Sequence, residues 1–177
     1  MNSGTDCRSE PLSILLGANS QSEGACHTKD FPCLWFDHQA EEAAKFYTGI
    51  FKNSKITNIS HYGKGAPVPE GTVMTVAFEI EGHEFIALNG GTHYQITPGI
   101  SFVIYCHTQE EIDYYWDHLS AGGKNNVCGW TTDKFGVTWQ VVPSDIGSIA
   151  KSPKAMQALM TMTKLDVAVL RAARDSE

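Results

Sequence analysis

An internal repeat limits the possible folds of this chain more than any single residue does. Residues 34–47 and 103–116 match at a constant offset of 69 positions, so that His38 corresponds to His107 and Glu41 to Glu110. In each copy an apolar run precedes a segment whose apolar residues recur at the 3.6-residue spacing of a helix. The repeated unit is therefore a strand followed by an amphipathic helix. Because a solenoid needs about three stacked units, two copies predict one pseudo-symmetric domain instead.

Length and charge narrow the class of protein and its partners. A chain of 177 residues with 42% hydrophobic and 19% charged residues suits one globular domain. The net charge of −7 disfavours nucleic acid and anionic membranes, because basic patches supply most of that affinity. No window approaches the roughly 18 apolar residues of a membrane span. We therefore expect neither nucleic acid nor a membrane as a partner.

The first 29 residues differ in composition from the rest, since they are rich in Ser and Gly and have no sustained hydrophobic period. We predict a poorly ordered tail over 1–29 and a single domain over 30–177. The apolar patch at 14–16 is too short for the core of an export signal. The five cysteines are scattered and form no Cys-x-x-Cys pair, which favours neither a disulfide framework nor a zinc finger. A reducing, cytoplasmic location is the expectation.

Between the two repeats the hydrophobic pattern changes to period two. Residues 74–80 alternate apolar and polar side chains, and a turn at 81–83 leads to 85–89, which predicts a hairpin. A weaker strand is expected at 54–62, and short strands at 128–132 and 137–142 after the second helix, which ends at Gly122-Gly123. The predicted order is strand, helix and three strands, used twice.

The C-terminal segment shows helical spacing again. Pro153 at a first turn and apolar residues at 156, 159 and 160 predict a helix from 153 to 163. Asp166 is a candidate cap for a second helix that runs to Ala173. We hypothesise that this extension covers a cleft or a partner subunit.

Several segments together resemble the PhnB-like branch of the vicinal oxygen chelate superfamily, which includes glyoxalase I, extradiol dioxygenases and bleomycin-binding resistance proteins. The resemblance covers about residues 31–170 and is carried by the segments 33–37, 40–47, 88–91, 128–130 and 133–140. It implies an α+β fold in which paired βαβββ modules form a curled mixed sheet around a cleft, usually in a homodimer. The modules would span about 31–91 and 100–144, with the helical extension at about 153–174. Proteins of this branch often carry the name 3-demethylubiquinone-9 3-methyltransferase.

The glycines do not suit a methyltransferase that uses S-adenosylmethionine. Such a cofactor normally needs a Gly-rich turn between a strand and a helix, where backbone amides can approach it. Here the glycines cluster at 63–71, 90–91 and 122–123, and Gly63-Lys64-Gly65 leads into Pro67 rather than into a helix. We expect no methyl transfer and no cofactor.

The superfamily's enzymes hold a divalent metal with four side chains, typically His, Gln or Glu. The resemblance carries these positions to Pro32, 86–88, Ser101 and Gln140, and a shift of register would add only Asp30 or Asn89. Such a set is too poor in His and carboxylate to hold a catalytic metal. His38 with Glu41, and His107 with Glu110, have the spacing of a metal pair, but both lie at predicted helix starts, where acidic residues favour the helix dipole. We therefore expect no bound metal.

Aromatic residues near the predicted strand ends are candidates for the walls of a small-molecule site. Trp139, at the centre of the last strand, is assigned to the core. Cys128 is either a nucleophile or a buried small hydrophobic residue, and the sequence names no base that would activate it. No catalytic residue is assigned. The expected ligand-binding residues are Trp35, Asn89, Phe102, Tyr105, Cys128, Trp130, Asp133 and Gln140.

Two classes of function are consistent with the sequence. The first is a dimeric, metal-free protein that binds a small apolar or aromatic molecule in its cleft. The second is an enzyme, either a metal-dependent lyase or oxygenase or a metal-free isomerase. The missing metal ligands favour the first class.

Overall fold

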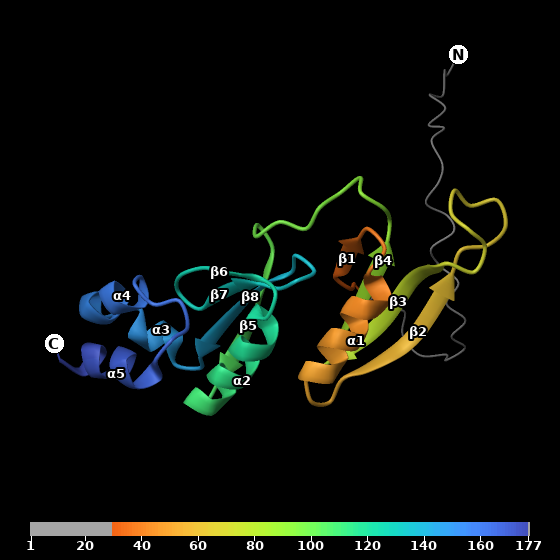
Figure 1. The fold of residues 1–177 in the computed structure, drawn as a ribbon. Coiled ribbons are helices and arrows are strands. Elements are labelled where there is room, and N and C mark those ends of the chain that lie inside the picture. The colour runs from red at the N-terminus through yellow and green to blue at the C-terminus, as the bar shows by residue number, and fades with distance from the viewer. Residues whose placement is uncertain (1–29, 177) are drawn as a thin grey trace, which may run out of the picture. The chain divides into compact units, whose positions relative to one another are not determined.

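The first module forms a four-stranded sheet with a helix across one face (Figure 1). The computed structural model describes residues 30–176 of the chain, so the predicted tail lies outside the described residues. The strands run in the order β1-β4-β3-β2, with β1 parallel to β4 and the other pairs antiparallel. The elements are β1 (Cys33–Phe36), α1 (Ala40–Ile50), β2 (Lys55–His61), β3 (Val73–Ile80) and β4 (His83–Asn89).

The second module repeats this arrangement with shorter connections. Its sheet has the order β5-β8-β7-β6, in which β5 and β8 are parallel, and α2 packs on one face. We call the two sheets sheet A and sheet B. The predicted α+β order is confirmed, as two mixed sheets of four strands that do not close on themselves. The elements are β5 (Ser101–Cys106), α2 (Gln109–Ser120), β6 (Lys124–Asn125), β7 (Trp130–Thr132) and β8 (Thr138–Pro143).

The 69-residue offset holds in the helices but not in the strands before them. Tyr47 in α1 and Trp116 in α2 are equivalent by this offset, and both are buried. Phe36 in β1 is buried against the helix, whereas the matching Tyr105 in β5 is 61% exposed. Because side chains alternate along a strand, a slip of one residue exchanges the two faces. The repeat therefore predicted the elements correctly, while the buried faces of β1 and β5 differ by one residue of register.

The helix-facing sides of both sheets share one hydrophobic core. Trp139 of β8 packs on Tyr47 and Phe51 of the first module, with ring centroids 5.4 Å apart in both cases. Phe85 of sheet A meets Phe102 of sheet B edge to face, with ring centroids 5.4 Å apart. Since the helices and these aromatic residues fill the space between the modules, the opposite face of each sheet is directed away from the core.

The C-terminal extension packs on the second module and has a small core of its own. It contains α3 (Ile146–Ile149), α4 (Pro153–Leu159) and α5 (Val167–Asp175), which bury Leu159, Leu165 and Leu170 together with Val142. The predicted cap at Asp166 is confirmed, because its side chain accepts a hydrogen bond from the backbone N–H of Val169.

The predicted helix from 153 to 163 corresponds to α4. The prediction that it reaches Thr163 is wrong, since α4 ends at Leu159. The reason is a bond to another part of the chain. The backbone carbonyls of Met162 and Thr163 accept hydrogen bonds from the N–H groups of Cys128 and Gly129, at 2.7 and 3.0 Å. The predicted stripe is interrupted accordingly, and Met160 is 56% exposed.

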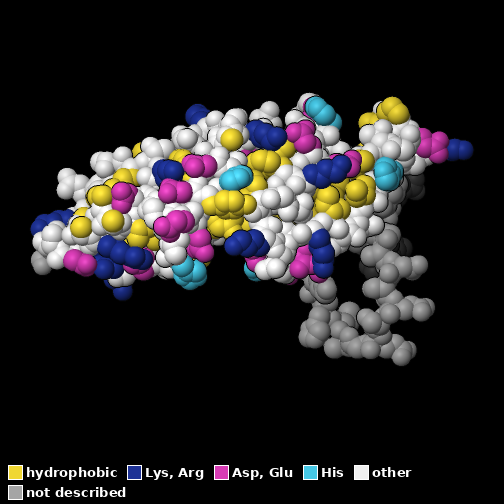
Figure 2. Space-filling view, turned by 60° about the horizontal axis from the view of Figure 1, so that its bottom comes forward, with side chains coloured by type: hydrophobic (Ala, Val, Ile, Leu, Met, Phe, Trp, Pro, Cys, Tyr) yellow, Lys and Arg dark blue, Asp and Glu magenta, His cyan; other side chains and the backbone are white. Residues whose placement is uncertain are grey.

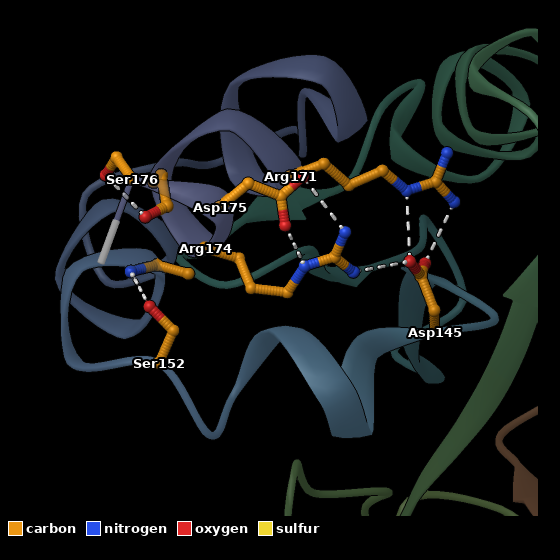
Figure 3. A network of polar contacts seen from close by, with 8 residues as sticks. Asp145, Ser152, Arg171, Arg174, Asp175 and Ser176 are labelled. Atoms are coloured by element: carbon orange, nitrogen blue, oxygen red, sulfur yellow. Dashed lines mark hydrogen bonds and ion pairs between the residues drawn. The ribbon is translucent and has the colours of Figure 1, made fainter.

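A charged cluster links α3 to α5 (Figure 3). Arg171 donates two hydrogen bonds of 3.0 Å to the two carboxylate oxygens of Asp145, and Arg174 adds a longer one. The guanidinium of Arg171 holds the pKa of Asp145 below its usual value. This bidentate geometry fixes the start of α3 against α5.

Among the described residues, no helix is long and apolar enough to cross a membrane.

Candidate functional site

The side of sheet B that faces away from the helices carries a row of three side chains from three strands. Val103 of β5 is in register with Gln140 of β8, which is in register with Trp130 of β7. Val103 is 43% exposed, and Trp130 and Gln140 are partly exposed. Tyr105 lies one step further along the same side. We call this side, with residues 101, 103, 105, 130, 132, 138 and 140, the sheet B face.

The polar groups of the sheet B face are held in place by one another. The side-chain amide of Gln140 donates a 2.8 Å hydrogen bond to the hydroxyl of Ser101. The hydroxyls of Thr132 and Thr138 are 2.9 Å apart. Within residues 30–176 no group donates a hydrogen bond to the amide oxygen of Gln140, so this oxygen can accept one from a bound molecule. The result is an aromatic and aliphatic surface with a few fixed polar groups, which is the composition that small-molecule sites use.

Trp35 stands on the corresponding side of sheet A. Its indole N–H donates a 2.8 Å hydrogen bond to the carbonyl of Gly91, and Tyr94 packs edge to face on its ring at 4.9 Å. Gly90 is required here, because a Cβ at this position would overlap the Trp35 ring. Beside Trp35 lies a pocket of about 370 Å³ that also borders Asp37, Gln39 and Phe135.

The structure brings three of the eight predicted ligand-binding residues together. Tyr105, Trp130 and Gln140 all belong to the sheet B face. Trp35 lies on sheet A, and Cys128 lies beside the C-terminal extension, with its sulfur 3.5 Å from that of Met160. Val103 was missed, although its spacing of two from Tyr105 in a strand would have indicated it.

The other three predicted residues point into the interior. Phe102 packs on Phe85 and Trp139 in the shared core. The side-chain oxygen of Asn89 accepts a 2.8 Å hydrogen bond from the backbone N–H of Ala40, and its amide donates to the carbonyl of Val73. In these positions the side chains hold the fold together.

Asp133 makes four hydrogen bonds from a buried position. One carboxylate oxygen accepts from the hydroxyl of Tyr47 at 2.9 Å and from the indole N–H of Trp139 at 2.8 Å. The other accepts from the backbone N–H groups of Phe135 and Val137 in the turn before β8. Burial raises the pKa of Asp133, while these hydrogen bonds oppose the shift. The Asp133 side chain therefore joins the two modules and has no acceptor position directed at the sheet B face.

None of the three thiols in the described part of the chain is activated as a nucleophile. Burial raises the pKa of Cys128 and of Cys33, and burial with the nearby charge of Glu111 raises the pKa of Cys106 to about 12. A raised pKa lowers the thiolate fraction at neutral pH. Of the two readings of Cys128, the geometry favours a small hydrophobic residue.

The four positions to which the resemblance carries the metal ligands lie in two adjacent pairs, one pair in each module, and their side chains do not fit a metal. Ser101 and Gln140 are hydrogen-bonded, and Pro32 adjoins Ile86, whose N–H donates to its carbonyl. A serine and a glutamine with two apolar side chains lack the imidazole and carboxylate ligands of a transition metal. Within residues 30–176, no three His, Cys, Asp or Glu side chains form a group suited to a metal ion.

Each turn from a strand into a helix is built without glycine. These turns consist of Asp37-His38-Gln39, His107-Thr108 and Ser144-Asp145. Their side chains prevent the close backbone approach that a nucleotide cofactor makes at a Gly-rich turn. On the face shown in Figure 2, Lys and Arg side chains alternate with Asp and Glu and do not gather into a basic patch.

Two βαβββ modules with one open face on each sheet define a protein of the vicinal oxygen chelate class. The family model described as 3-demethylubiquinone-9 3-methyltransferase matches residues 28–142, and the chain belongs to this PhnB-like family. No curated protein matches the chain.

Solved structures of similar proteins extend this comparison. A putative 3-demethylubiquinone-9 3-methyltransferase, a PhnB protein from Bacillus cereus, is 34% identical, with 66% of this chain and 99% of that chain covered and a TM-score of 0.60. Protein PA1353 from Pseudomonas aeruginosa is 20% identical, with 65% of this chain and 96% of that chain covered and a TM-score of 0.54. The fosfomycin resistance protein FosX from Listeria monocytogenes is 15% identical, with 70% of this chain and 96% of that chain covered and a TM-score of 0.49.

Proposed function

We propose that this protein binds a small apolar or aromatic molecule on the sheet B face, without a catalytic metal, and that it does so as a homodimer. The observation that carries the proposal is the row of Val103, Gln140 and Trp130, which presents an aromatic ring, an aliphatic side chain and a fixed amide on one open surface. Aromatic walls with a few placed hydrogen-bonding groups give a site both affinity and orientation.

The geometry of the core supports the proposal of a dimer. A small-molecule site usually buries about 70–90% of its ligand, and one open sheet face leaves the ligand exposed on its other side. The helix sides of the two sheets share one core, so the open faces of a single chain do not face each other. A second copy can supply the missing wall, and the exposed side chains of Val103 and Tyr105 provide apolar surface for it. The homodimer thus completes the cleft.

The chemistry of the site argues against the two enzymatic alternatives that use a cofactor. Ser101 and Gln140 stand where a metal-dependent lyase or oxygenase would need strong ligands. The glycine-free turns do not suit the binding of S-adenosylmethionine for methyl transfer, whatever the family is called. Binding without chemistry at a metal is therefore the function that the residues support best.

Protein purified without chelator tests the proposal in one set of measurements. We expect a dimer by sedimentation, no stoichiometric Zn, Ni, Fe or Mn, and saturable binding of the dye 8-anilinonaphthalene-1-sulfonate. Tyr105→Asp places a charge on the open face, so it should weaken dye binding at least tenfold and shift the protein towards monomer. Val169→Asp, an exposed position on α5, is the matched control and should change neither property.

Two results would contradict the proposal. If Tyr105→Asp leaves the dimer and the dye affinity unchanged, the sheet B face is not the binding surface. One tightly held metal per chain that is lost in Gln140→Ala would instead favour a metal-dependent enzyme.

A further inference from the structure

The sheet B face changes from polar to apolar along its strands. At one end, four residues in register across all four strands are polar, and Ser101 and Thr138 are followed by Thr132 and Lys124. The middle row is mixed and contains Gln140 between Val103 and Trp130. At the other end Tyr105 is in register with Val142, and both are apolar or aromatic. A molecule lying along the strands would meet these rows in order.

The C-terminal extension stands at the apolar end of this face. Val142 lies on the same side of β8 as Gln140, and it is buried by the extension's own core together with Leu165. Cys128 packs against the same cluster, and the Met160 side chain rests on its sulfur at 3.5 Å while remaining 56% exposed. An exposed methionine side chain that packs on a neighbouring sulfur is a suitable contact for an apolar group of a ligand.

The extension is fixed to the second module rather than attached by a flexible joint. Its segment 162–163 accepts two backbone hydrogen bonds from Cys128 and Gly129. The side chain of Gln109 in α2 donates to the carbonyl of Leu165 and accepts from the N–H of Val167. Lys164 adds ion pairs to Asp113 and Asp117. A segment held at so many points keeps a constant position relative to sheet B.

The side chains of Cys128 and Met160 form a wall at the apolar end of the sheet B face. The family match ends at residue 142, before α3 begins at Ile146. Met160 therefore lies outside the part that matches the family, whereas Cys128 and Val142 lie within it. A substitution at Met160 can change which ligands fit, while the family-matched part of the sheet B face stays the same.

We propose that the extension sets the length of the ligand, with Met160 as the specificity-determining residue at the apolar end. The inference rests on the proposed function and names the ligand class more closely. The ligand is a small amphipathic molecule whose hydrogen-bonding group lies towards Ser101 and Gln140 and whose apolar group ends against Met160 and Cys128. A longer apolar group does not fit, because the hydrogen bonds between the extension and the second module prevent Met160 from moving away from it.

A series of para-alkylphenols, from methyl to octyl, tests this inference by displacement of bound 8-anilinonaphthalene-1-sulfonate. In the wild-type protein we expect the affinity to rise about two- to fourfold for each added methylene, and then to fall once the chain reaches the wall. Met160→Ala removes three heavy atoms from the wall and should move the optimum to a chain longer by about one to three carbons, while phenols shorter than the optimum bind as before. Val169→Ala, which shortens another exposed apolar side chain of the extension, should leave the optimum unchanged.

The outcomes separate this inference from the function on which it rests. If wild-type protein binds the series and Met160→Ala leaves the optimum where it was, or no optimum exists, the wall is refuted and the binding function stands. If wild-type protein binds neither the dye nor any phenol, the proposed function fails and the wall with it. A shift as large in Val169→Ala as in Met160→Ala would show a general loosening and would also refute the role of Met160.

Discussion

The two module helices begin in different ways, although they occupy equivalent places in the repeat. Helix α2 is capped locally, since the Thr108 hydroxyl accepts a hydrogen bond from the N–H of Glu111, and the Glu111 carboxylate accepts one from the N–H of His107. At the start of α1, Gln39 makes no side-chain cap. Instead Asn89, at the end of β4 and 49 residues away, accepts the hydrogen bond of Ala40.

The difference shows two ways to satisfy the free N–H groups of a helix start. A local cap forms with the helix and depends on nothing else. A distant cap forms only when the sheet is in place, so that it couples the helix to the strand order. Asp133 extends the second type across the modules, because it binds Tyr47 of α1 and Trp139 of β8 at once. The distant polar contacts should therefore matter more for stability than the local one.

The largest effect is expected for Asp133→Ala. It leaves the buried donors of Tyr47 and Trp139 without partners, so we expect a loss of about 3 kcal/mol or more in the free energy of unfolding, measured by urea denaturation. Asp133→Asn is the matched control, because it keeps an acceptor for the turn N–H groups and should cost less. A loss in Asp133→Ala below that of the local cap variant would break the comparison.

Asn89→Ala should have an intermediate effect. It removes the acceptor for Ala40 and the donor for Val73 together, which we expect to cost about 2 kcal/mol of unfolding free energy. Asn89→Asp retains the acceptor for the helix, removes the donor to the strand and places a carboxylate against the Val73 carbonyl. If Asn89→Ala costs no more than Thr108→Ala, the bond to α1 is not what makes this residue important.

Thr108→Ala should have the smallest effect of the three, about 1 kcal/mol. The site is exposed, so water replaces the lost hydroxyl at the start of α2. Thr108→Ser keeps the hydroxyl and serves as the control in the same denaturation experiment. Equal losses for Thr108→Ala and Asn89→Ala would mean that distance along the chain has no bearing on the strength of a cap.

The features that were predictable from the sequence are those that depend on neighbouring residues. The periodicity predicted the order of strands and helices, and Asp166 caps α5 as expected. The end of α4 was not predictable, because it depends on the bond from Cys128 to Met162. The helix offset does not predict the strand faces, because a strand can slip by one residue while the helix does not.

The same distinction explains the candidate site. Aromatic residues were recognisable by type, and three of the proposed residues share the sheet B face. Phe102 and Tyr105 were grouped together, although an odd spacing of three in a strand puts them on opposite sides. Asp133 and Asn89 stood in specific family segments, but only the folded chain shows that their polar atoms are used by Tyr47, Ala40 and other interior groups.

The shared core has a consequence for the origin of the repeat. A single module cannot seal its own apolar side, because Trp139 of one half is covered by Tyr47 and Phe51 of the other. A free-standing ancestor of this unit would have exposed such rings to water unless it paired with a second copy of itself. Duplication and fusion of the gene would then have joined two polypeptides that were already associated, and the core contact between the modules would be older than the linker that now connects them.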